Sequence, residues 1–143
     1  MPIVGFNFDK INVEKHKQVE PNMQVKTDVV IVDVKEEKLP TGNTKLDGLR
    51  FDFKFNLNYE PKVGELLLSG FIFYLDDPKI IKDLIKSWKK DKILPKPVTA
   101  EIINMVLYRA NIKALYLSQE VNLPPHIQMP RVSEKAKAKD YIG

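Results

Sequence analysis

The strictest pattern in the sequence is an alternation of apolar and polar residues between Leu49 and Tyr59. A repeat of two places successive side chains on opposite faces of a β-strand. The stretch therefore predicts a strand with one buried face and one polar face, and this strand needs other elements to cover its apolar side. The apolar set is Leu49, Phe51, Phe53, Phe55, Leu57 and Tyr59.

Two earlier segments also have the pattern of strands. In Phe6–Val13 the apolar residues change parity part-way, which predicts a β-bulge near Asp9-Lys10. In Met23–Val34 the odd positions up to Ile31 share one face, while Val30, Val32 and Val34 are predicted to share the other. The second half of this strand is therefore expected to be apolar on both sides.

The segment Leu66–Leu75 is apolar at both parities, so both of its faces are expected to be covered. A connection is predicted at residues 40–43, and a hairpin loop at residues 60–64. Short connections of this kind favour antiparallel pairing of neighbouring strands. The sequence thus predicts a four-stranded antiparallel sheet.

Two helices are expected after the sheet. Asp77 is predicted to cap the first helix, with Pro78 at its first position and an apolar stripe facing a lysine-rich face. The second helix is predicted over Val98–Val121, with Asn122 as its C-cap, and its apolar residues cover more than one stripe. The stripe of the first helix comprises Ile80, Ile81, Leu84, Ile85 and Trp88.

The fold class is therefore α+β, with two C-terminal helices packed on a four-stranded antiparallel sheet. The 143 residues are the length of one domain. Residues 1–132 are predicted to form it, and residues 133–143 a charged, mobile tail.

A count of apolar faces adds a further expectation. Two helices can cover one face of the sheet, but apolar residues are predicted on the other face too. Large exposed apolar patches are rare on soluble monomers, so a homo-oligomer, a bound partner or both are expected. The candidate contact residues are Val30, Val32, Val34, Phe71, Phe73 and Tyr74.

No pattern for catalysis or cofactor binding occurs in the sequence. There is no cysteine, no glycine-rich phosphate loop and no serine-nucleophile motif. The two histidines, His16 and His126, are far apart and fit no metal-ligand spacing. The expectation is a binding protein without catalytic residues, metal or cofactor, and the absence of cysteine and of a membrane-spanning stretch favours the cytoplasm.

A net charge of +4 leaves one alternative open. Lysines gather in Lys79–Lys92 and Lys135–Lys139, where they could attract nucleic acid phosphates. The aromatic residues of the alternating strand could stack on bases, although a strand burying one face explains them better. A nucleic-acid-binding module is thus the second hypothesis, and a structural subunit of a larger assembly is the third.

In the order of its predicted elements and in scattered residues, the chain resembles the SecB family of export chaperones and their archaeal SecB-like relatives. The matching stretches are Phe6–Ile11, the strand pair Leu49–Leu75 with its Tyr59-x-Pro61 turn, and Ile103-Asn104 through Leu123-Pro124-Pro125. The resemblance covers about residues 3–132 and includes no catalytic motif.

This resemblance implies a dimer or a dimer of dimers, and an ATP-independent holdase that binds unfolded or extended apolar polypeptide segments. SecB proteins resemble one another in being acidic, which serves docking to the translocation motor, whereas this chain is basic. The implied partners are therefore non-native polypeptides, or a specific partner such as a toxin–antitoxin component. No membrane insertion is expected, and nucleic acid is not the expected ligand.

Overall fold

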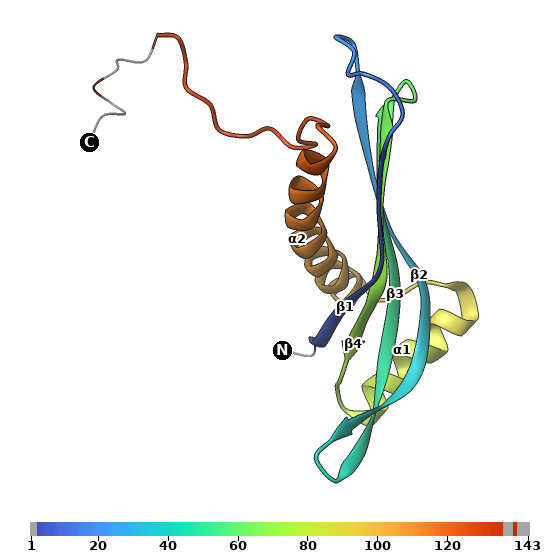
Figure 1. Ribbon diagram of the computed structural model, residues 1–143. Coiled ribbons are helices and arrows are strands. Elements are labelled where there is room, and N and C mark those ends of the chain that lie inside the picture. The colour runs from blue at the N-terminus through green and yellow to red at the C-terminus, as the bar shows by residue number, and fades with distance from the viewer. Residues whose placement is uncertain (1–2, 136–138, 140–143) are drawn as a thin grey trace.

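The computed structural model describes residues 3–135 and residue 139; the remaining part of the predicted tail lies outside the described residues. The chain forms four strands and then two helices, in the predicted order (Figure 1). Their bounds are β1 Ile3–Lys15, β2 Gln24–Thr41, β3 Thr44–Glu60, β4 Gly64–Tyr74, α1 Pro78–Asp91 and α2 Lys96–Glu120.

The strands form one antiparallel sheet in the order β1-β4-β3-β2, which confirms the predicted sheet. Consecutive strands β2, β3 and β4 are neighbours, whereas β1 pairs with β4. The long alternating strand β3 is therefore central, and β1 and β2 are the two edges of the described sheet. The predicted hairpin loop joins β3 to β4, and Gly42-Asn43 form the turn between β2 and β3.

The apolar face of β3 is the centre of the core. All six of its predicted apolar side chains are at most 1% exposed. They pack with the buried residues of both helices in one cluster, which includes Ile81 and Trp88 of α1 and Ile102 and Val106 of α2. Both helices thus cover the same face of the sheet, as predicted.

The pairing of β1 with β4 is interrupted by a bulge at the predicted place. Its register with β4 changes between Phe8 and Lys10, which confirms the bulge at Asp9. Gly70 of β4 pairs with Phe8, and a Cβ atom added at Gly70 would lie 1.9 Å from the carbonyl oxygen of Asn7. Glycine therefore allows the backbones of β1 and β4 to approach closely inside an apolar strand.

Strand β2 differs from the prediction in two ways. It continues past Val34 to Thr41, so that Pro40 lies within the strand and not in the connection. Its register with β3 also shifts between Ile31 and Asp33, because Val32 is an extra residue. The expectation that Val34 shares a face with Val30 was wrong, because the bulge turns Val34 toward the helices, where it is buried.

The helix ends follow the sequence signals only in part. Pro78 occupies the first turn of α1, but the Asp77 side chain makes no capping hydrogen bond, and Ile80 is exposed, unlike the rest of its predicted stripe. At the end of α2, Asn122 has a left-handed backbone, and Leu123 N–H donates to the Ser118 carbonyl over 2.9 Å. This geometry closes the helix in a Schellman motif, with Leu123 buried below it.

We expect Gly70→Ala to destabilise the fold, because the new methyl group would overlap the Asn7 carbonyl. Overpacking of this kind costs about 3 kcal/mol in the free energy of unfolding, which urea denaturation would measure. Asn58→Ala on the exposed side of β3 serves as the control and should change stability by less than about 0.5 kcal/mol. Equal stability of the two variants would contradict the close approach of β1.

Candidate functional site

An apolar groove lies beside the free edge of β2, between that strand and the two helices. Its cavity has a volume of about 390 Å³. Trp88 of α1 and Ile103 of α2 line it opposite the strand, and Leu94 in the connection between the helices lines it as well. We call this site the β2-edge groove; its lining residues are Val29, Val30, Ile31, Trp88, Lys92, Leu94, Thr99 and Ile103.

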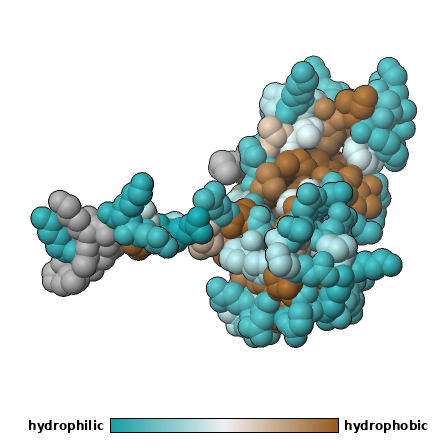
Figure 2. Space-filling model, turned by 90° about the horizontal axis from the view of Figure 1, so that it is seen from above, coloured by the Kyte–Doolittle hydropathy of each residue, from teal (hydrophilic) through white to brown (hydrophobic). Residues whose placement is uncertain are grey.

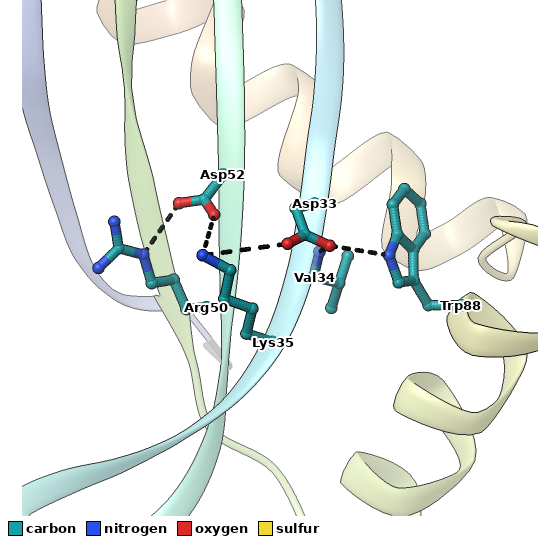
Figure 3. A network of polar contacts seen from close by, with 6 residues as sticks. All are labelled: Asp33, Val34, Lys35, Arg50, Asp52 and Trp88. Carbon is teal, nitrogen blue, oxygen red and sulfur yellow. Dashed lines mark hydrogen bonds and ion pairs between the residues drawn. The ribbon is translucent and has the colours of Figure 1, made fainter.

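The Trp88 ring is held in this groove by a polar contact to β2. Its indole Nε1–H donates to Asp33 Oδ1 over 3.2 Å, and the Val34 N–H donates to the same oxygen over 2.9 Å (Figure 3). Asp33 directly follows the bulged Val32, so the bulge also places the carboxylate that Trp88 reaches. The wall of the groove is therefore fixed relative to the strand edge.

The same network continues across the sheet to β3. Asp33 and Asp52 are cross-strand partners, and Lys35 Nζ lies 3.9 Å from Asp33 Oδ2 and 3.4 Å from Asp52 Oδ2 (Figure 3). Arg50 Nε donates to Asp52 Oδ1 over 2.9 Å, and this hydrogen bond raises the pKa of Arg50. The two cations offset the repulsion between paired carboxylates, which would otherwise destabilise the sheet here.

The six predicted contact residues do not form one surface. Val34 and Tyr74 are 4% and 3% exposed and belong to the core under the helices. Phe71 and Phe73 lie half-buried on the opposite face of the sheet, and the centroids of their rings are 5.1 Å apart. Of the six, only Val30 lines the β2-edge groove, from the strand edge, because its side chain shares the open face of the sheet with its partner Lys54. The role of the six residues in polypeptide binding stays a prediction.

The face of the sheet away from the helices is mixed in character. The guanidinium of Arg50 lies 3.9 Å from the centre of the Phe71 ring and covers it. Lys54 and Asn58 also point to this side and are exposed. The predicted surplus of apolar surface is therefore smaller on this face than the sequence pattern indicates.

A second apolar surface lies on the exposed side of α2, where its residues line shallow pockets together with Ile3 and Phe8 of β1. Tyr108, Ile112 and Tyr116 are spaced four residues apart and are between 57% and 66% exposed. Their spacing places them in one row along the helix. We call this row the outer stripe of α2. Seen from above, hydrophobic side chains gather between hydrophilic ones on the body, from which the C-terminal segment projects (Figure 2).

The segment after α2 is tied to the core before it leaves the body. The Tyr59 hydroxyl donates to the Pro124 carbonyl over 2.7 Å, and burial raises the pKa of this phenol. His126 Nε2 lies 2.7 Å from Asn111 Oδ1, and its ring meets Phe55 edge-on at 6.1 Å. These contacts fix the point at which the following residues depart.

One cluster that the sequence analysis missed could hold a metal ion. The ligand atoms of Glu14, His16 and Glu65 lie within 4.8 Å of one another at the ends of β1 and β4. Pairing of β1 with β4 places Glu14 opposite Glu65, a contact that spacing along the sequence cannot reveal. All three residues are exposed, and His16 Nε2 lies 3.5 Å from Glu65 Oε1, which also suits a surface ion pair.

The proposed RNA platform is not available in this fold. Phe51, Phe53 and Phe55 are at most 1% exposed, so their rings cannot stack on bases. The lysines of α1 remain exposed, and Lys135 is exposed as well, whereas residues 136–138 of the second basic run lie outside the described chain. Within residues 3–135, no helix is long and apolar enough to cross a membrane.

Comparisons with known proteins gave one structural similarity. No family model matches the sequence, and no curated protein matches it. The structure is similar to a Mycobacterium tuberculosis SecB-like chaperone, Rv1957, solved in complex with a ChAD peptide from the HigA1 antitoxin. The similarity covers 94% of this chain and 91% of the other, at 12% sequence identity and a TM-score of 0.45.

We expect the contribution of His126 to stability to depend on pH. Burial lowers the pKa of His126 below its ordinary value of 6.5, so the unfolded chain takes up a proton before the folded one does. The contribution is full above about pH 6.5 and is lost as the pH falls toward the folded pKa. The difference in unfolding free energy between the protein and His126→Gln, from urea denaturation, should be smaller at pH 5 than at pH 7.5. An equal difference at both values would contradict the burial of a neutral imidazole.

Proposed function

We propose that this chain binds extended apolar segments of non-native polypeptides in the β2-edge groove and acts as an ATP-independent holdase. The observation that carries the proposal is the position of an apolar groove directly beside a free strand edge. The groove offers apolar pockets, and the strand offers backbone hydrogen-bonding groups. An extended peptide can use both at once, whatever its sequence.

The energetics suit reversible capture. Burial of apolar surface contributes about 25 cal/mol per Å², so a few apolar side chains of a client give useful affinity before ordering costs are subtracted. Backbone pairing with β2 adds hydrogen bonds that any client residue except proline can donate. The combination favours wide specificity with modest affinity, which a holdase needs.

The functional class and the cellular location of the chain are part of the same proposal. A holdase of this kind needs no nucleotide, in line with the lack of a phosphate-binding loop in the sequence. We propose that the chain is SecB-like in function and works in the cytoplasm. The relation to archaeal members of that family stays a prediction.

We expect Val29→Asp to weaken the binding of a fluorescein-labelled, extended apolar peptide about tenfold. Val29 lines the groove and shares the helix-facing side of the sheet with its partner Phe55, so a charge then lies in the groove. Fluorescence anisotropy would measure the affinity, and suppression of aggregation of a denatured client without nucleotide should decrease in parallel. Val13→Asp is the matched control, because Val13, like Val29, is a half-buried valine packed against the core but lies on the other edge strand. Equal loss of affinity in both variants would place the site elsewhere.

We further propose that the protein is a homo-oligomer that associates through the outer stripe of α2. Two tyrosines and an isoleucine in one exposed row form the kind of aromatic, apolar surface that interfaces favour. Arg109 and Lys113 flank this row, and Glu101 and Glu120 lie toward its two ends. An antiparallel pair of α2 helices centred on Ile112 would place the apolar row of one copy against that of the other.

We expect Ile112→Glu to dissociate the oligomer, because it buries carboxylates facing each other across a two-fold contact. Multi-angle light scattering would show a shift from the mass of the assembly toward the 16.5 kDa of one chain. The control Glu120→Gln, near the end of α2, should leave the mass unchanged. A protein that is already monomeric at micromolar concentration would refute the association.

A further inference from the structure

The segment after His126 carries three exposed apolar side chains. Ile127, Met129 and Val132 are between 44% and 59% exposed, and the segment projects away from α2 (Figures 1 and 2). We call residues 127–135 the C-terminal arm. Pro130 within the arm favours an extended backbone. The arm thus has the extended, apolar chemistry of the proposed clients.

The arm starts about two helical turns from the β2-edge groove. The His126 ring packs on Phe55, and Phe55 is the cross-strand partner of Val29, which lines the groove. Asn111, the hydrogen-bond partner of His126, lies in the same i, i+4 row of α2 as the groove residue Ile103. Two contacts of the His126 ring therefore anchor the base of the arm on the side of α2 that faces β3, about two helical turns from the groove.

The arm is also long enough to fill the groove. The eight-residue step from Asn111 back to Ile103 corresponds to about 12 Å along a helix. Fully extended, residues 127–135 span about 30 Å. A change of backbone direction at Ile127 and Gln128 would bring Met129 and Val132 over Val29 and Trp88 without disturbing either anchor.

We propose that the C-terminal arm folds back over the β2-edge groove of its own chain and competes with clients for it. The inference rests on the proposed function of that groove. Pro130 has no N–H to donate to β2, so the arm pairs with the strand less completely than a client does. A client with a full set of N–H groups displaces the arm, and the arm covers the groove again when the client leaves.

The double substitution Met129→Ser/Val132→Ser tests the competition, since it removes the apolar side chains that would enter the groove. We expect the variant to bind a labelled apolar peptide at least about threefold more tightly, because the arm no longer occupies part of the sites. Trp88, the single tryptophan of the chain, lines the groove and should become more accessible to acrylamide quenching without any peptide. The control Gln128→Ser/Ser133→Ala changes polar residues of the arm and should behave like the unmodified protein.

Crosslinking tests the location of the arm directly, since the chain has no cysteine of its own. The variant Val29→Cys/Val132→Cys should form a disulfide within one chain under mild oxidation, because position 29 faces the groove. The control Val4→Cys/Val132→Cys, which involves the other sheet edge, should not. A disulfide between two chains, equal crosslinking in both variants, or none in either would overturn the proposal.

The two proposals fail in different ways. If the crosslink between positions 29 and 132 forms and Trp88 responds to the arm substitutions, but no variant binds peptide, the arm closes the groove and the holdase function is refuted. If peptide binds all variants equally and neither crosslinking nor quenching reports the arm, the holdase function stands and the arm proposal is refuted.

Discussion

Burial of the apolar face of β3 is the interaction on which the rest of the structure depends. A side chain of this size contributes about 1.5–3 kcal/mol when it is fully buried, and six of them lie in one row between the flanking strands and the two helices. This row requires a cover along its whole length. Helix α1 covers it toward Phe51, and α2 covers it toward Tyr59, whose hydroxyl bonds the chain just after that helix. The groove is the gap that remains where the two helices meet at β2.

The bulge at Val32 shapes that gap. One extra residue turns Val34 into the core, leaves Val30 at the edge, and aims Asp33 at the indole of Trp88. A regular strand would place Val34 on the open face with Val30 and would leave Trp88 without this acceptor. The local irregularity thus converts a uniformly apolar strand end into a groove with one fixed aromatic wall.

Contacts between distant parts of the sequence hold the start of the C-terminal segment in place. Tyr59 in the hairpin region and Pro124 after α2 belong to two of the stretches on which the SecB resemblance was based, and a hydrogen bond joins them. His126, which the sequence presents as an isolated surface histidine, is a half-buried anchor between α2 and β3. Together they fix the point at which the arm leaves the body, between α2 and β3.

The sequence by itself determined the strands, the helices and the sheet face that is buried, because periods of 2 and 3.6 residues record which side chains avoid water. It also indicated the bulge in β1, where the parity of apolar residues visibly changes. Only the tertiary structure decided the bulge at Val32, because a strand that is apolar at both parities carries no trace of a register shift. The groove, the Glu14–His16–Glu65 cluster and the anchor of His126 arise in the same way, since each joins residues whose proximity depends on strand pairing and helix packing and not on their spacing along the chain.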